Sequence, residues 1–381
     1  MQALDWAQRA AAPLSVLISV LFVPLPAWAL PQGATLASGQ ASVTQAGAAM
    51  QISTSDRVIL NWQQFSIGAG ESVRFIQPAA TSAVLNRVTG ATASILAGNL
   101  SANGRVFLVN PNGIVVGPDA RIDTNAFVAS TLNMTDEDFL NDRLRFAGGG
   151  TGSIRNEGSI VTPAGGHVIL VAPEIENRGL ISTPEGRLIL AAGQSVEIGD
   201  LQFANVSFQL QAPEDRIVNV GQLIADGGVV GAFAGSLRNA GTIRANRLGT
   251  DGDGTVRIMS AGDIHLDAGS VVQADGGDVS IQSVNGAVYV DGSISTGNDP
   301  ERPGWGTIWG NEVRFGPTAG VSSSIGTMLY TSMISGGAII SLQELPPVEF
   351  VVFTEAENYA VTLVTSDATG SNLAGAGSGT P

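Results

Sequence analysis

The chain has 381 residues, with 18 Lys and Arg against 33 Asp and Glu, and no Cys, which gives a formal net charge of −15. This acidic balance argues against nucleic acid and anionic membrane surfaces as partners, because both attract clustered Lys and Arg. The lack of Cys excludes disulfide bonds and thiolate metal sites, and it suits a chain that crosses a pore unfolded. With 49 Gly and only 13% charged residues, the composition favours an all-β protein with many tight turns.

Residues 1–29 have the pattern of a secretory signal peptide. Arg9 precedes an apolar segment, residues 10–25, and Ala27-Trp28-Ala29 forms an A-x-A cleavage pattern. The alternative is a membrane anchor, but the segment is shorter than the roughly 20 apolar residues that a spanning helix needs, and prolines interrupt it. We therefore expect cleavage after residue 29, and no later segment has enough uninterrupted apolar residues to span a membrane.

The next stretch, up to residue 88, predicts short strands. Residues 41–44 and 72–76 alternate with period two and are separated by Gly or Pro breaks. A stacked β structure needs a cap at its end, because open strand edges invite aggregation. Trp62 and Phe65 offer large apolar area for such a cap, and a functional aromatic site is the alternative for them.

The sequence NPNG stands between two short runs of strand-forming residues, 105–109 and 114–116. Pro111 presets its φ angle, Asn112 tolerates the left-handed region and Gly113 enters it freely, so these residues predict a turn after Asn110. One NPNG is a weak signal by itself. Its weight comes from the ordered set of motifs around it, NWQQF at 61–65, SAVLNRVT at 82–89, NG at 103–104 and FVASTL at 127–132.

That ordered set resembles the N-terminal secretion domain of the filamentous haemagglutinin family, and within it the high-molecular-weight adhesin branch. The resemblance covers roughly residues 32–280. One departure concerns residues 77–81, QPAAT, where the haemagglutinin branch proper often has an additional Asn-Pro-Asn turn upstream of NPNG. A role assigned to that upstream turn is therefore not carried over.

The resemblance implies export across the Gram-negative outer membrane by two-partner secretion, with a cognate outer-membrane transporter as the partner. It also implies that the NPNG turn, Asn110 to Gly113, contributes to recognition or folding during export. Further implications are an adhesin-like contact with a host glycan or receptor, and a location outside the cell or on its surface. The other motif positions carried over, as strand and cap motifs, are Asn61, Trp62, Phe65, Asn86 and Arg87.

An internal repeat supports a solenoid independently of the resemblance. The pattern Asn-x-Gly-x-Ile/Leu recurs at spacings of 21, 42 and 20 residues, and a Gly-led apolar strand follows each copy. A period near 20 with short strands, without a leucine-rich consensus or a long helix, leaves a right-handed parallel β-helix. Equivalent residues then form columns, with Ile inside, Asn bonding backbone at a corner and Gly supplying a positive φ there. The corner residues are Asn156, Asn177, Asn219 and Asn239.

Two segments interrupt the repeat. Residues 135–144 are acidic and predict a short helix, with Thr135 as its N-cap and Asp138 at the third position. Residues 206–214 predict an extra hairpin outside the β-helix.

The chain is expected to divide into three parts after the signal peptide. These are a secretion domain over residues 30–285, a C-terminal β extension over 286–365 with an edge strand at 348–353, and a disordered tail over 366–381.

Enzyme chemistry on such a scaffold needs clustered carboxylates with a base on the outer face of one sheet. The Asp residues at 251, 253, 275 and 278 stand beside Gly, mostly in turns, and fit neither an EF-hand nor a calcium-binding nonapeptide. His167 and His265, nearly a hundred residues apart, are expected as exposed strand residues. We therefore predict no enzyme, no metal and no cofactor.

Three N-x-S/T triplets, at Asn99, Asn133 and Asn205, are candidate glycosylation sites, although a chain rich in Asn, Ser and Thr contains such triplets by chance.

The sequence leaves three hypotheses for the function. The first is a secreted, adhesin-like exoprotein. The second is a β-helix polysaccharide lyase or hydrolase, and the third is a short secreted effector without adhesion of its own.

Overall fold

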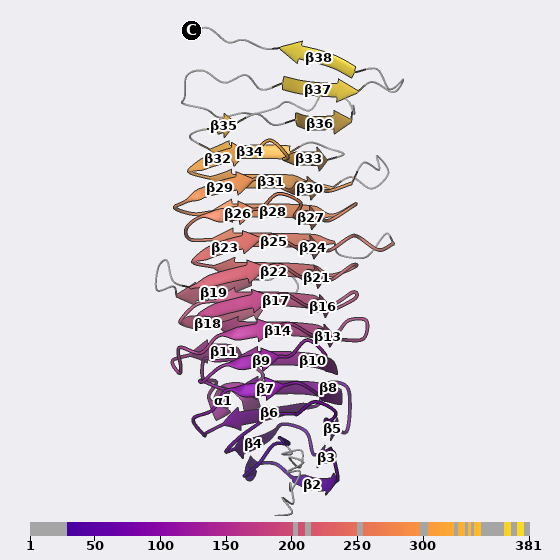
Figure 1. Ribbon diagram of the computed structural model, residues 1–381, viewed down its shortest axis with the longest axis vertical. Helices are drawn as coiled ribbons and strands as arrows, with labels where there is room; N and C mark the ends of the chain where they lie inside the picture. The colour runs from indigo at the N-terminus through magenta and orange to yellow at the C-terminus, as the bar shows by residue number, and fades with distance from the viewer. Residues whose placement is uncertain are drawn as a thin grey trace, which may run out of the picture.

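The computed structural model describes residues 29–200, 205–209, 215–249, 254–297 and 304–323, and five strands beyond them, within 327–376. Figure 1 shows these strands stacked as a column, with the N-terminal strands at one end. Each complete turn of the chain contributes three strands. One turn is β12 (Ile154–Asn156), β13 (Ser159–Val161) and β14 (His167–Ala172). Parallel pairing with the equivalent strands of the next turn confirms the predicted parallel β-helix.

Three ladders of strands run along the column. The first contains β7 (Ser94–Leu96), β9 (Ile114–Val116), β12, β15 (Glu174–Asn177), β20 (Arg216–Asn219), β23 (Ser236–Asn239), β26 (Ile264–Leu266), β29 (Ala287–Val290), β32 (Glu312–Phe315) and β35 (Ile334–Gly336).

The second ladder contains β5 (Ser72–Ile76), the first halves of β8 (Asn99–Val109) and β10 (Arg121–Ser130), β13, β16 (Leu180–Ser182), β21 (Gln222–Ile224), β24 (Thr242–Arg244), β27 (Val271–Gln273), β30 (Ser293–Ser295), β33 (Gly320–Ser323), β36 (Ile339–Gln343) and β37 (Thr362–Ser366). The third contains β4 (Val58–Trp62), β6 (Ala83–Val88), the second halves of β8 and β10, β14, β17 (Arg187–Ala192), β22 (Val229–Ala234), β25 (Thr255–Ser260), β28 (Asp278–Ser283), β31 (Gly306–Gly310) and β34 (Thr327–Thr331).

The interior of the column is filled by apolar residues in register. Ile160 pairs with Ile181, Ile181 with Leu223 and Leu223 with Ile243 in successive turns. All four are at most 1% exposed. Alternation along each strand sends every second side chain inward, and the parallel register then places like residues above one another. The inward column predicted from the repeat is therefore present.

The N-terminal end is closed by antiparallel strands. β1 (Thr35–Ser38) pairs with β4, and β2 (Ala41–Ala46) pairs with β3 (Ala49–Thr54). Trp62 and Phe65 are buried beneath them, with ring centroids 5.5 Å apart in an edge-to-face arrangement. They supply the apolar area that an end cap needs, as the sequence predicts.

A second layer covers part of the outside of the third ladder. It consists of helix α1 (Asp136–Leu140) and a three-stranded antiparallel sheet, β11 (Leu144–Ala147), β18 (Ser195–Asp200) and β19 (Asn205–Gln209) (Figure 1). Phe139, Phe146 and Val196 of this layer pack with outward side chains of the ladder, such as Phe107 and Ile169, in a second apolar cluster. Within the described part of the chain, no helix is long and apolar enough to cross a membrane.

The ladders run across residues 285 and 286 without a break, since β28 pairs with β31 and β29 with β32. Within residues 366–381 the structure describes one strand, β38 (Asn372–Ala376), which pairs antiparallel with β37. The predicted signal peptide, up to residue 28, and the predicted edge strand at 348–353 lie outside the described residues.

Candidate functional site around the NPNG turn

The NPNG turn is organised around a fully buried asparagine. Asn110 is 0% exposed, and its Nδ2 donates to the carbonyl oxygen of Thr92 at 3.0 Å and to Oγ of Ser94 at 2.9 Å. Its Oδ1 accepts from the backbone N–H of Asn112 at 3.0 Å. The N–H of Gly113 closes the turn by donating to the carbonyl of Asn110 at 3.1 Å, and Gly113 has a φ of +115°. Both the buried Asn and the Gly are therefore required by the local geometry.

The following turn of the chain lies directly against this loop. A Cβ placed on Gly150 would come within 1.8 Å of the carbonyl oxygen of Pro111, so only Gly fits there. The N–H of Gly152 donates to the same oxygen at 3.3 Å. Asn112 alone among the four turn residues is exposed, and its Nδ2 donates to the carbonyl of Gly90 at 2.8 Å. The turn thus presents one held asparagine side chain to the outside.

The upstream motifs form a buried hydrogen-bonded chain next to the turn. The indole N–H of Trp62 donates to Oδ1 of Asn86 at 3.0 Å, and Asn86 Nδ2 donates to the carbonyl of Phe107 at 3.2 Å. Asn86 is 0% exposed, so each of its polar atoms needs such a partner. One side-chain amide therefore links three adjacent strands, β4, β6 and β8.

Arg87 connects the β-helix to the outer layer. Its guanidinium donates to the carbonyl of Met134 at 2.7 Å and forms an ion pair with Asp136 at 2.7 Å, and it also contacts Oδ1 of Asn61 at 3.4 Å. Asp136 lies in the first turn of α1. The structure therefore brings Asn61 and Arg87 together and attaches them to the helix.

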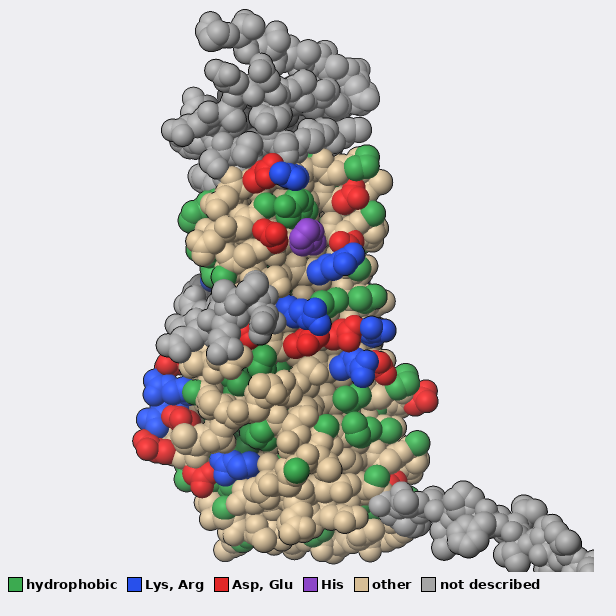
Figure 2. Space-filling model, turned by 60° about the vertical axis from the view of Figure 1, so that its left-hand side comes forward, with side chains coloured by type: hydrophobic (Ala, Val, Ile, Leu, Met, Phe, Trp, Pro, Cys, Tyr) green, Lys and Arg blue, Asp and Glu red, His purple; other side chains and the backbone are tan. Residues whose placement is uncertain are grey.

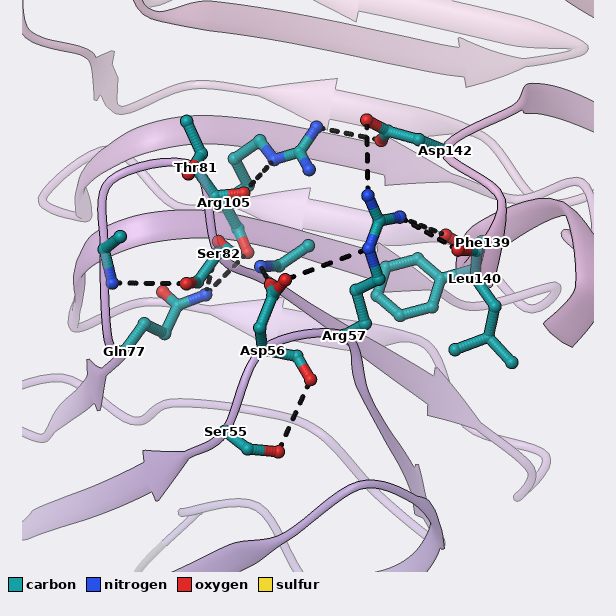
Figure 3. Close-up of polar contacts among 12 residues, drawn as sticks. Ser55, Asp56, Arg57, Gln77, Thr81, Ser82, Arg105, Phe139, Leu140 and Asp142 are labelled. Atoms are coloured by element: carbon teal, nitrogen blue, oxygen red, sulfur yellow. Dashed lines mark hydrogen bonds and ion pairs between the residues drawn. The ribbon is translucent and has the colours of Figure 1, made fainter.

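The sequence gives no indication of a second anchor for α1, which the structure reveals (Figure 3). Arg57 donates to the carbonyls of Phe139 and Leu140, at 3.4 and 3.0 Å, at the C-terminal end of the helix. A cation at that end also interacts favourably with the helix dipole. Arg57 has a φ of +53°, an uncommon backbone conformation for a residue with a side chain. Its contacts lie more than 80 residues away, so no local pattern could predict them.

The loop that replaces the second Asn-Pro-Asn turn is fixed by Gln77. This residue is 4% exposed, and its Nε2 donates to the carbonyls of Ser82 and Arg105 at 2.9 and 3.1 Å (Figure 3). Asn103 exchanges two hydrogen bonds with the backbone of Gln77. Arg105 in turn forms an ion pair with Asp142, just beyond α1, at 2.9 Å. Gln77 and Asn103 therefore hold this loop to strand β8.

The four corner asparagines form one continuous ladder. Asn156 donates to Asn177 at 2.8 Å, Asn177 to Asn219 at 2.8 Å and Asn219 to Asn239 at 2.7 Å, each from Nδ2 to Oδ1. All four are at most 1% exposed. Their bonds run mainly from side chain to side chain, with additional bonds to corner carbonyls, such as Asn177 to Gly179 at 3.3 Å.

The explanation predicted for the corner glycines is wrong. The glycines that follow the ladder are absent from the described residues with positive φ. A Cβ on Gly179 would instead lie 2.1 Å from the carbonyl oxygen of Gly158, and one on Gly221 would lie 2.1 Å from that of Gly179. Close approach of the neighbouring turn, rather than backbone angle, excludes a side chain here.

The two histidines lie on different ladders. His167, on β14, is half-buried, and burial followed by the charge of Arg187 lowers its pKa. His265, on β26, is exposed and stacks on Tyr289. The prediction of exposed strand residues is therefore confirmed for His265, whereas His167 is only partly exposed.

The remaining candidate residues are spread over the column. Asp275 accepts from Ser295, and Asp278 accepts from the backbone of Trp305, while Asp251 and Asp253 lie outside the described residues. Among the asparagines of the N-x-S/T triplets, Asn99 and Asn133 are exposed, and the side chain of Asn205 is not described. Among the described positions, Asp275, Asp278, Asn99 and Asn133 have no hydrogen bond to the NPNG turn.

Two known proteins are similar to this chain in sequence. The chain is 32% identical over 180 residues to the heme/hemopexin-binding protein of Haemophilus influenzae, a match that covers 43% of the chain and 19% of that protein. A second Haemophilus influenzae protein of the same name is 39% identical over 80 residues, covering 21% of the chain and 9% of that protein. The chain therefore spans less than a fifth of the length of these relatives.

A solved structure resembles most of this chain. The crystal structure of the HMW1 secretion domain from Haemophilus influenzae superimposes with a TM-score of 0.64 at 30% identity, covering 82% of this chain and 87% of that one. The family model of the TPS secretion domain, where TPS denotes two-partner secretion, matches residues 27–283. This match includes the cap, the NPNG turn, the outer layer and the asparagine ladder. The chain therefore belongs to the TPS secretion domain family of exported proteins.

Proposed function

We propose that an outer-membrane transporter recognises this chain at the NPNG turn during export, and that the exported protein acts by binding a host molecule. The observation that supports the first part is the contrast within the turn. Asn110 is fully buried and fixes the loop, whereas Asn112 is exposed although its side chain is held by the carbonyl of Gly90. Because Asn112 is exposed, its side chain can be changed with little loss of stability, so a requirement for it in export would point to recognition of the sequence rather than to folding of the turn.

Family membership places the chain among proteins exported across the outer membrane of Gram-negative bacteria. In the proposed sequence of events, residues 1–29 direct the chain to the periplasm and are removed. The transporter then binds the unfolded chain, which adds a strand to the edge of a sheet in the transporter. Folding of the parallel ladders outside the cell makes the passage irreversible and draws the chain outward. Folding supplies this driving force because no nucleotide energy is available in the periplasm.

The second part of the proposal, an adhesin-like role, is supported by the named relatives. Two are heme/hemopexin-binding proteins, and the structural neighbour is the secretion domain of HMW1. The acidic balance of 18 basic against 33 acidic residues disfavours nucleic acid and anionic lipid as the bound partner. Among the remaining classes, a protein or glycan of a host surface is the partner we propose.

The test separates recognition from folding. In cells that carry the cognate transporter, Asn112→Ala is expected to lower export strongly, while the purified variant loses only about 1 kcal/mol of stability. Asn110→Ala leaves buried partners unsatisfied and is expected to cost about 1–3 kcal/mol as well as export. The matched control is Asn125→Ala, because Asn125 also holds a distant carbonyl, that of Ala80, at 3.0 Å.

Export and the free energy of unfolding are measured for all three variants. Recognition predicts that Asn112→Ala falls well below the relation between export and stability that the other two define. If all three variants lie on one line, the turn acts only through folding, and the proposed recognition is wrong.

A further inference from the structure

A groove lies on the outer side of the first ladder, toward the C-terminal half of the column. Four outward residues follow one another in register on β23, β26, β29 and β32: Arg238, His265, Tyr289 and Arg314. Asp267 and Asp291 also line the groove, whose volume is about 650 Å³. Figure 2 shows basic, acidic and hydrophobic side chains interspersed around a histidine on the upper part of the column.

The side chains of the groove are held in place by one another. The rings of His265 and Tyr289 stack at 4.4 Å with an angle of 8° between their planes, and the guanidinium of Arg314 lies 5.5 Å from the Tyr289 ring centroid. Arg238 is bonded to Asp267 at 2.6 Å, and Arg314 to Glu312 at 2.6 Å. These contacts restrict rotamers before any ligand arrives, which lowers the entropic cost of binding.

We propose that this groove binds an uncharged, linear oligosaccharide lying along the axis of the column. Sugar hydroxyls both donate and accept hydrogen bonds, and the groove offers guanidinium donors beside carboxylate acceptors. Two Arg and two Asp balance in charge, so the groove has no excess of positive charge with which to select an anion. The lining side chains recur once per strand, at roughly 4.8 Å, so successive units of a polymer meet an equivalent position at each turn.

Other occupants fit less well. A peptide added as an extra strand would need an open sheet edge, but β26 and β29 each pair with strands on both sides. A protein partner anchored by apolar residues would need a desolvated pocket, whereas the side chains of Arg238 and Arg314 are 64% and 52% exposed. An anionic glycan would meet the carboxylates of Asp267 and Asp291.

The groove crosses the end of the region that matches the TPS secretion domain. That match ends at residue 283, so Arg238, His265 and Asp267 lie within it and Tyr289, Asp291 and Arg314 lie beyond it. The inference gives a chemical class to the host molecule in the proposed function and rests on that part of it. It does not depend on recognition at the NPNG turn.

The experiment uses the full exported chain and immobilised neutral oligosaccharides of increasing length, in glucose, galactose, mannose and N-acetylglucosamine series. Sulfated and sialylated oligosaccharides serve as anionic comparators. We expect binding to at least one neutral series, with affinity rising with length. Tyr289→Ala and Arg238→Ala are expected to lower that affinity about tenfold or more. Arg155→Ala, an exposed residue on β12 of the same ladder, is the control expected to bind as wild type does.

Tyr289→Phe retains the stack but removes the hydroxyl, and Arg238→Ala alters an exposed residue, so both variants test the groove if Tyr289→Ala fails to fold. Binding only to anionic oligosaccharides, no binding to any neutral series, or binding that none of the groove variants changes would each overturn the inference. Export of the groove variants is measured in parallel and is expected to be normal. A groove variant that loses binding but is exported normally supports the role of the groove. A failure of export would instead bear on the secretion proposal.

Discussion

At the corners between the first and second ladders, consecutive turns of the chain come so close that a side chain has no room. The carbonyl of Gly158 occupies the position where Gly179 would carry its Cβ, and the same relation holds between Gly179 and Gly221. The adjacent asparagines use the same closeness to bond from turn to turn. Each corner residue is therefore constrained by a neighbour about 20 or 40 positions away, rather than by its own strand.

A pair of glycine variants tests this constraint. Gly179→Ala would place a methyl group 2.1 Å from a backbone oxygen, so we expect a loss of about 3 kcal/mol in the free energy of unfolding. Gly199→Ala, on β18, meets nothing within 4 Å and has no positive φ, so it is expected to change stability by less than about 0.5 kcal/mol. Denaturant unfolding of the two variants gives both values. Equal stability for the two would show that the corner relaxes freely around a methyl group.

At the scale of single elements, helix α1 depends on contacts from outside itself. It has five residues, far fewer than an isolated helix needs in water. Thr135 caps its N-terminus by accepting from the N–H of Asp138 at 3.0 Å, as the sequence predicts, and Arg57 contacts its C-terminal carbonyls. The Thr135 hydroxyl, followed by Arg143, lowers the pKa of Asp138 below its ordinary value, against the opposing effect of burial.

This lowered pKa predicts how α1 responds to acid. Because the folded pKa lies below the unfolded value of about 3.9, the ionised carboxylate stabilises α1 above pH 4, and this contribution is lost as the pH falls through the folded pKa. Thr135→Val and Arg143→Gln are each expected to raise the pKa of Asp138, because the Thr135 hydroxyl bond and then the bond and charge of Arg143 lower it. NMR titration of the Asp138 carboxyl measures both shifts. A pKa of Asp138 that stays unchanged in either variant would contradict the assignment.

At the scale of the whole molecule, the periodic part of the fold could be read from the sequence and the outer layer largely could not. The spacing of Asn177, Asn219 and Asn239 fixes the register, because identical turns must stack in register to bury one apolar column. The N-cap at Thr135 was readable because its partner lies three residues away. Arg57 and Gln77 bond to residues 82 and 28 positions away, outside the repeat, so no periodic pattern in the sequence predicts these contacts.

The molecule therefore contains two apolar cores of different extent. The inner one extends from Leu30 to Val321, whereas the outer cluster covers the part of the third ladder beneath α1, β11 and β18. In a stacked repeat each turn contacts mainly its neighbours, so a defect in the inner column weakens adjacent turns first. A defect in the outer layer should release that layer and leave the ladders paired.

Two truncations of buried side chains distinguish the cores. Ile181→Ala opens a cavity in the inner column, and we expect it to cost about 2–5 kcal/mol and to speed amide hydrogen exchange in β13, β16 and β21. Phe139→Ala removes the ring that packs edge-to-face on Phe107 at 5.3 Å, and we expect faster exchange in α1 and β11 with unchanged protection of β13 and β16. Exchange monitored by mass spectrometry on wild type and both variants provides the comparison. If Phe139→Ala also loosens β13 and β16, the two cores unfold as one unit, and the outer layer is part of the cooperative column rather than a layer added to it.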